Sequence, residues 1–140
     1  MKKVLLFLIS ISILSNACKK QEDLDPVLYG TWNVTKVEGV YYLNNIPVTY
    51  PVDNNPTGTI NFNSNGTGKQ DYSYSIAGTV YPQNSNFIWE ANAQQITIDR
   101  TNEPDMTWTR VLNEANKQVA TYTYVVDATQ KWDYTLTLEK

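Results

Sequence analysis

The stretch Tyr29-Gly30-Thr31-Trp32-Asn33-Val34 is the first β-type run of the chain and sets the pattern for the segments that follow. Trp32 and Val34 are two positions apart, so a strand turns both side chains toward the same face. The next apolar residue is Val37, whereas unbroken alternation would have used position 36, which is Lys36. This change of parity predicts a bulge or bend near Lys36. A long first strand that bends is what a closing barrel requires.

The chain after residue 29 repeats the alternation in seven further segments, and no segment has a convincing helical period. β-Branched and aromatic residues alternate with polar ones, and Gly, Asn or Pro punctuate them. The expected strands are 30–42, 58–63, 67–76, 86–90, 94–100, 106–112, 117–126 and 131–139. We therefore expect an all-β fold, an eight-stranded antiparallel up-and-down barrel, because closure removes the exposed edges of an open sheet. A β-sandwich is the alternative.

Two connections are rich in proline and are expected to be loops, because proline cannot donate to a strand ladder. Residues 43–56 carry three prolines, at positions 47, 51 and 56, and are expected to lie over one mouth of the barrel. Residues 78–86 form the second expected loop and contain Pro82. A tight turn is expected at Asn65-Gly66, since this pair accepts the positive φ that hairpins demand.

The N-terminus has the organisation of a bacterial lipoprotein leader. The basic pair Lys2 and Lys3 precedes an apolar run at 4–14 and small residues at 15–17, and Cys18 follows directly. An apolar run of this length is typical of a signal peptide and too short to cross a bilayer. We expect residues 1–17 to be the signal peptide and Cys18 to be acylated, for example with palmitate. An ordinary signal peptide with an incidental thiol is the alternative.

Residues 18–27 are expected to form the lipidated cysteine and a disordered tether, and residues 28–140 the folded domain. The acids of the tether resemble the export tag that sends lipoproteins to the outer face of the outer membrane, although a solvated linker explains them too. We expect a lipid-anchored, surface-exposed protein of the outer membrane, held by its acyl chains. The formal net charge of −3 argues against nucleic acid as a partner.

Four segments stand in order and at hairpin spacing: LYGTW at 28–32, GTINFNSNGTG at 58–68, FIWE at 87–90 with ITI at 96–98, and YTLTLE at 134–139. Together they resemble the lipocalin-like domain common in Bacteroidota lipoproteins, across residues 28–140. The resemblance implies an up-and-down barrel at the cell envelope, in a family mostly without an assigned ligand, and the wider lipocalin habit adds the expectation of an apolar small molecule. Lipocalins cover the first-strand Trp with an Arg near the end of the last strand. Here that strand has no Arg, and Lys131 and Lys140 flank it.

The composition offers few side chains that are suited to catalysis. The chain has no histidine, which removes the usual general base and the commonest transition-metal ligand. Carboxylates remain, but strand parity puts most of them on the outer face, where a solvated charge is the ordinary explanation. We expect no enzyme activity, no metal and no cofactor. A carboxylate-dependent hydrolase is a distant alternative.

The sequence is rich in large aromatic side chains, with ten tyrosines and four tryptophans. A small eight-stranded barrel can be filled by such side chains or can hold one small ligand. The expected ligand-binding residues are Tyr72, Tyr74, Trp89, Trp108, Arg110, Tyr122 and Tyr124. The sequence thus predicts a monomeric, non-enzymatic, envelope-anchored lipoprotein that binds a small hydrophobic or aromatic ligand. The alternative is a structural or protein-interaction module with a filled barrel.

Overall fold

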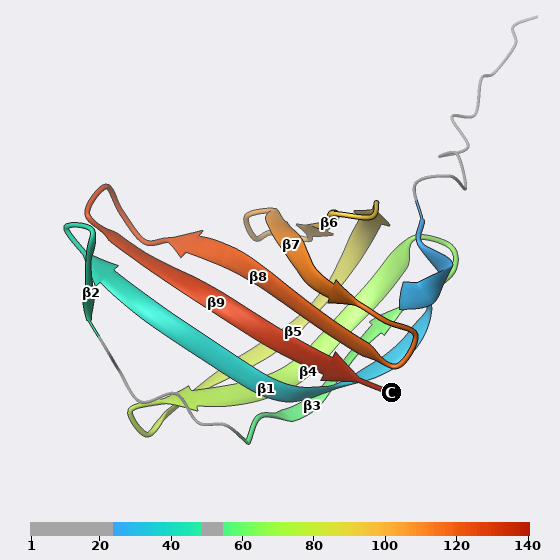
Figure 1. The fold of residues 1–140 in the computed structure, drawn as a ribbon, viewed down its shortest axis with the longest axis horizontal. Coiled ribbons are helices and arrows are strands. Elements are labelled where there is room, and N and C mark those ends of the chain that lie inside the picture. Colours follow the sequence, from blue (N-terminus) through green and yellow to red (C-terminus); the bar gives the residue numbers. More distant parts are fainter. Residues whose placement is uncertain (1–23, 49–54) are drawn as a thin grey trace, which may run out of the picture.

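The computed structural model describes residues 24–48 and 55–140, and nearly all of them belong to strands (Figure 1). One short 3-10 helix, η2, spans Pro26–Leu28. The strands are β1 (Gly30–Leu43), β2 (Ile46–Val48), β3 (Thr57–Phe62), β4 (Thr67–Ile76), β5 (Thr79–Ala91), β6 (Gln95–Arg100), β7 (Met106–Asn113), β8 (Lys117–Val125) and β9 (Gln130–Glu139).

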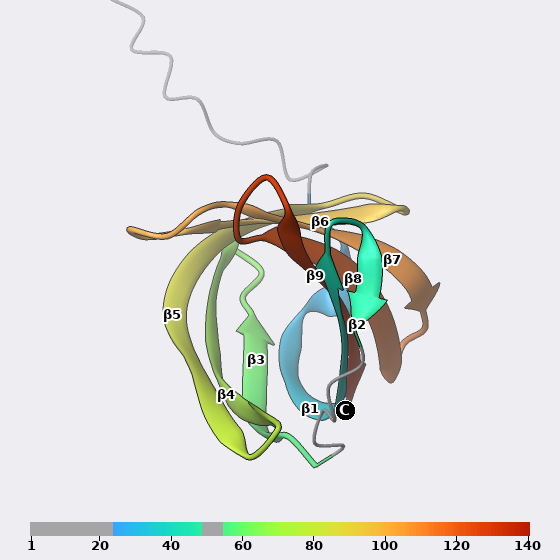
Figure 2. The same cartoon turned by 90° about the vertical axis from the view of Figure 1, so that its left-hand side faces the viewer.

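The strands form a closed antiparallel barrel. Their order is β2-β1-β3-β4-β5-β6-β7-β8-β9, and an additional pairing between β1 and β9 closes the sheet. Figure 2, turned by 90° from Figure 1, shows the strands arranged around a common centre. The short β2 pairs with the far end of β1 alone, so eight strands make up the wall. The predicted eight-stranded up-and-down barrel is confirmed, and the β-sandwich alternative is wrong.

The bulge that the sequence predicts near Lys36 is present in β1. Val34 faces Leu138 and Lys36 faces the next residue of β9, so Thr35 has no partner position in the ladder. This extra residue restores the parity, because Trp32, Val34 and Val37 are all buried.

The prediction of a loop at 78–86 is wrong, because residues 79–86 belong to β5. A two-residue turn at Ala77 and Gly78, both with positive φ, joins β4 to β5. Pro82 pairs with Ser73 of β4, while β5 pairs with β6 only from Phe87 onward. The other edge of this half of β5 is free, and a proline is tolerated at such an edge.

The connection at 43–56, which was expected to be a loop, also contains a strand that the sequence did not predict, β2. Asn44 and Asn45, both with positive φ, turn the chain into β2, which pairs back onto β1. Residues 49–54 lie outside the described residues, and with them the expectation that this connection covers a mouth of the barrel.

The folded part begins before residue 28. Asp25 caps η2 by accepting a hydrogen bond from the backbone N–H of Val27, and Leu24 packs against the core. Residues 24–27 of the expected tether thus belong to the barrel domain, whereas 18–23 lie outside the described residues.

The two ends of the barrel differ. One end, on the right of Figure 1, carries η2, the β3–β4 turn and the C-terminus. It is filled by fully buried side chains, among them Leu28, Trp32, Ile60, Phe62 and Leu138. The other end carries the β4–β5 and β8–β9 hairpins (Figure 1). Within the described residues no helix is long and apolar enough to cross a bilayer.

Candidate ligand-binding cavity

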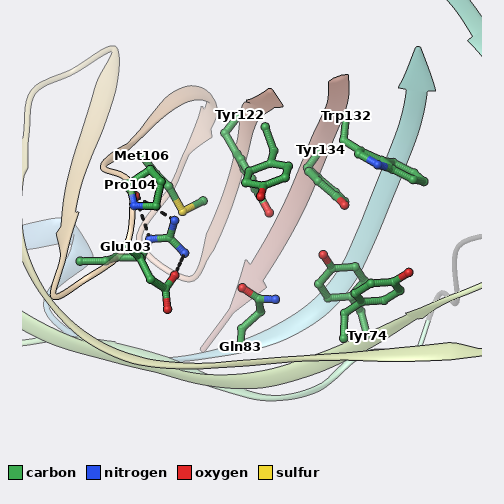
Figure 3. A pocket seen from close by; sticks show the side chains of 11 residues that line it. Tyr74, Gln83, Glu103, Pro104, Met106, Tyr122, Trp132 and Tyr134 are labelled. Atoms are coloured by element: carbon green, nitrogen blue, oxygen red, sulfur yellow. Dashed lines mark hydrogen bonds and ion pairs between the residues drawn. The ribbon is translucent and has the colours of Figure 1, made fainter. Parts of the chain in front are cut away.

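A cavity of about 480 Å³ lies at the end of the barrel that carries the β4–β5 and β8–β9 hairpins. Pockets for small molecules commonly measure roughly 300–1,000 Å³. The lining comes from the six strands β4 to β9 and the β6–β7 turn (Figure 3): Tyr74, Tyr81, Gln83, Arg100, Glu103, Pro104, Met106, Tyr122, Tyr124, Trp132 and Tyr134. The barrel is therefore filled at one end and hollow at the other.

One wall of the cavity is a row of nearly parallel rings on β8 and β9. The ring centroids of Tyr122 and Tyr134 are 5.1 Å apart, with 22° between the planes. Trp132 continues the row beyond Tyr134, at 5.6 Å and 14°. Behind Tyr122, the buried ring of Trp108 stacks at 5.9 Å and 23°. Because each ring is packed against its neighbour, the row presents a rigid aromatic surface to the cavity.

The facing wall comes from β4 and β5. The rings of Tyr74 and Tyr81 stack at 5.7 Å with 21° between the planes. Figure 3 shows Tyr74 across the cavity from Tyr122, Tyr134 and Trp132. The two walls meet where Tyr74 touches Tyr134 edge-on, at 5.9 Å and 70°. The cavity is thus a slot between two aromatic surfaces.

Hydrogen bonds between tyrosines tie the two walls together. The hydroxyls of Tyr72 and Tyr122 share a hydrogen bond, and so do those of Tyr74 and Tyr134. Burial raises the pKa of all four phenols, and the charge of neighbouring phenols raises it further. These side chains are un-ionised at neutral pH, so they give the slot polar groups without charge.

The charge in the cavity wall belongs to Arg100, at the end of β6. Its side chain is only 7% exposed. Nε and Nη2 donate to the carbonyl oxygen of Pro104, at 3.2 and 2.8 Å, and Nη1 forms an ion pair with Glu103. Glu103 lies in the β6–β7 turn and its side chain is 45% exposed. The buried cation therefore has a counter-ion that is itself half in solvent.

The predicted site residues fall into two groups. Tyr74, Tyr122 and Tyr124 line the cavity, while Tyr72 and Trp108 pack directly behind lining residues. Trp89 and Arg110 are not part of the lining. Trp89 donates from Nε1 to the carbonyl oxygens of Asn63 and Thr67, at the filled end. Cys18 lies outside the described residues.

Arg110 points inward, as strand parity predicts, but it contacts the segment that closes the filled end. Nη1 pairs with the carboxylate of Asp25 at 2.5 Å and also donates to the carbonyl oxygen of Asn92 at 2.9 Å. Nη2 donates to Oε1 of the buried Gln118 at 3.0 Å. Its side chain is 1% exposed. Arg110 thus fastens the N-terminal segment to the barrel wall.

Sequence reasoning missed the arginine that does line the cavity. Arg100 continues the alternation of Ile96 and Ile98 and so belongs to the same inward face, a signal that parity alone provides. Strand alternation also places Trp132 and Tyr134 on one face of β9, although neither was among the expected ligand-binding residues. Both have more contact with the cavity than Trp108 does.

The described side chains offer no obvious metal site. Across 24–48 and 55–140, no group of three His, Cys, Asp or Glu side chains is placed to hold a metal ion. The chemistry of the cavity is that of stacking, hydrogen bonding and one ion pair.

Comparisons with known proteins add little to this description. No protein-family model matches the chain, and no curated protein matches it. Among solved structures, lobster apocrustacyanin A1 is similar in fold, with a TM-score of 0.41 and 10% sequence identity over 81% of this chain and 61% of that chain. This chain thus spans less than two thirds of that protein's length. The pairing of the strands themselves establishes an all-β, closed eight-stranded up-and-down barrel, the architecture that lipocalins share.

Proposed function

We propose that this protein is a non-enzymatic, envelope-anchored lipocalin-like lipoprotein of the Bacteroidota type, which binds a small hydrophobic or aromatic ligand inside its barrel. The observation that carries the proposal is the 480 Å³ slot between the Tyr122–Tyr134–Trp132 row and the Tyr74–Tyr81 pair. Rings held in place by their neighbours contact a flat ligand without losing further side-chain freedom.

The distribution of packing favours binding over a purely structural role. A scaffold gains stability from a barrel filled along its whole length. Here the filled end contains most of the fully buried side chains, whereas the hollow end keeps Tyr81 and Tyr124 41% and 49% exposed.

The non-enzymatic part of the proposal is supported by the side chains at hand. The chain has no histidine. Among the lining residues the one carboxylate is Glu103, and it is engaged by Arg100. Glycoside hydrolysis by the usual route needs two carboxylates on facing sides of the substrate.

The anchoring part of the proposal gives the barrel an orientation. Cys18 precedes Leu24 by six positions, which allows a span of at most about 20 Å. Leu24 and Asp25 are held at the filled end, by the core and by Arg110 respectively. An acylated Cys18 would keep that end near the outer membrane and turn the mouth of the cavity away from it.

Binding is tested by isothermal titration calorimetry of the full chain in mild detergent, with a titration into micelles alone subtracted. The probe is 2-naphthalenemethanol, a flat and uncharged two-ring aromatic. We expect saturable binding that Trp132→Ala weakens several-fold through lost stacking. The matched control is Tyr42→Ala, which removes a ring outside the lining. Absence of saturable heat, or equal loss in both variants, would contradict the proposal.

The anchor is tested separately by Cys18→Ala in cells fed an alkyne-tagged palmitate. We expect the variant to lose both acyl labelling and membrane retention. Labelling that persists without Cys18 would contradict lipidation at that residue.

A further inference from the structure

The cavity of the proposed function has one feature that a plain aromatic slot does not need, which is the charge of Arg100. A guanidinium stays protonated at any ordinary pH. Burying it is costly unless it is paired and hydrogen-bonded. Arg100 nevertheless lies in the lining, with 7% of its side chain exposed.

The partners of Arg100 differ in how firmly they are held. The carbonyl oxygen of Pro104 accepts from Nε and Nη2, so it fixes the plane of the guanidinium. Nη1 faces Glu103, whose side chain is half exposed and projects from the five-residue turn between β6 and β7. An incoming carboxylate can exchange with that of Glu103, because Glu103 is the half-exposed partner and Arg100 then keeps a counter-charge. The position at Nη1 is therefore one that another acid group can take.

The surroundings of Arg100 favour an anion over a cation as the incoming group. Tyr74, Tyr122 and Tyr134 carry no charge at working pH, because burial raises the pKa of each phenol, and so none of them compensates the charge of Arg100. A cation brought to Glu103 would lie against the fixed guanidinium instead. Charge-assisted pairs between Arg and a carboxylate are shorter and stronger than neutral hydrogen bonds.

We propose that the ligand is a flat aromatic acid, whose ring system packs against the aromatic side chains that line the cavity and whose carboxylate replaces that of Glu103 at Arg100. This inference rests on the proposed function, since it names the chemical class of the ligand that the same cavity holds. Glu103 then acts as an internal competitor that occupies the acid position in the free protein.

The test compares three probes with the same two-ring system, namely 2-naphthoate, 2-naphthalenemethanol and 2-naphthylmethylammonium, titrated into the full chain by calorimetry with micelle blanks. We expect the acid to bind about tenfold more tightly than the alcohol, the ratio that corresponds to about 1.4 kcal/mol. We expect the ammonium probe to bind most weakly.

The decisive variant is Glu103→Gln, which removes the competing charge from an exposed turn and leaves the core untouched. We expect it to tighten 2-naphthoate several-fold more than it changes the affinity for 2-naphthalenemethanol. Glu114→Gln is the matched control: the same charge change in the exposed turn between β7 and β8, at the filled end. It should leave both affinities as they are.

Equal affinity for the acid and the alcohol, or tighter binding of the ammonium probe, would overturn the acid assignment while the proposed aromatic slot stands. An acid preference that Glu103→Gln does not strengthen would overturn the role given to Arg100 and Glu103. If none of the three probes binds, both the acid assignment and the proposed function fail.

Discussion

The ammonium of Lys140 lies 4.4 Å from the centroid of the Trp32 ring, and so the last residue of the chain covers the first aromatic residue of the barrel. The same Nζ donates to the carbonyl oxygen of Val27 at 3.3 Å. Trp32 in turn donates from Nε1 to the carbonyl oxygen of Leu28 at 2.7 Å. Lys140 thus joins three segments at the filled end.

Lys140→Ala should lower the free energy of unfolding by about 0.5–1 kcal/mol, the usual size of a cation–π contact at an exposed site. Lys140→Arg should retain the stability, because a guanidinium stacks on the indole equally well. Urea denaturation followed by tryptophan fluorescence measures both. Lys69→Ala is the control, since Lys69 forms an exposed pair with Asp71 and its loss should have no measurable effect. A loss in Lys140→Arg as large as in Lys140→Ala would contradict the stacking role.

Asp25→Asn should lower the free energy of unfolding by about 1.5–3 kcal/mol, the usual contribution of a hydrogen bond to a charged group. The reason is that Arg110 stays buried without its counter-charge. Burial raises the pKa of Asp25, but the hydrogen bond from Arg110, that from Val27 and the charge of Arg110 outweigh it, and the net pKa is lowered. A lowered pKa adds stability above the unfolded-state value of 3.8, and this stability is lost as the pH falls through the folded-state pKa.

The difference in urea midpoint between the wild type and Asp25→Asn should therefore be constant from pH 7 to about pH 5 and shrink at lower pH. Asp105→Asn, an exposed change in the β6–β7 turn, should show no such difference. A gap that stays constant down to pH 2 would mean that the carboxylate charge is not what stabilises the N-terminal segment.

The contrast between Arg110 and Arg100 shows what strand parity can and cannot predict. Alternation correctly turns Arg110 inward, and it would have done the same for Arg100 after Ile96 and Ile98. Parity does not predict how far along the barrel axis a side chain lies, because that position depends on strand direction and on register. Arg110 lies near the end of β7 that faces η2, whereas Arg100 leads into the turn at the cavity.

Pro82 marks a second limit of sequence reasoning. A proline excludes a central position in a sheet, but it does not exclude a strand half whose outer edge is free. Which edges are free depends on how far β6 extends along β5, and that length is set by the position of the β6–β7 turn. The closed barrel, the bulge in β1 and the inward aromatic faces were predictable because they depend on local alternation alone.

Alkaline pH should destabilise the protein through the tyrosines of the cavity. Burial raises the folded-state pKa of Tyr72, Tyr74, Tyr122 and Tyr134 above the ordinary value of 10.0. Their contribution to stability is fully present below pH 10 and is lost as the pH rises toward the folded-state values, since the unfolded chain ionises first.

Absorbance at 295 nm should show these four tyrosines ionising only together with unfolding, which circular dichroism detects. Tyr122→Phe removes one of them and should reduce the dependence of the urea midpoint on pH above 10. Reversible titration of all ten tyrosines near pH 10 with the fold intact would contradict the buried hydroxyl pairs.

Gly68→Ala should destabilise the filled end by about 1–3 kcal/mol, the usual cost of overpacking. A Cβ at this position of β4 would overlap the ring of Phe87 and lie 2.6 Å from the carbonyl oxygen of Asn61. Phe87 cannot retreat freely, because its ring is buried and meets Phe62 edge-on at a centroid distance of 5.5 Å. The absence of a side chain at residue 68 is therefore what allows Phe87 to close the core.

A double-mutant cycle separates the two clashes of Gly68→Ala. If the ring is the main obstacle, Phe87→Leu should cost less in the Gly68→Ala background than in the wild type, because the smaller side chain makes room for the methyl group. If the two losses add, the carbonyl oxygen of Asn61 is the obstacle and the ring is not. Gly78→Asn is the control, since a Cβ there meets nothing within 4 Å and Asn accepts the positive φ of that turn.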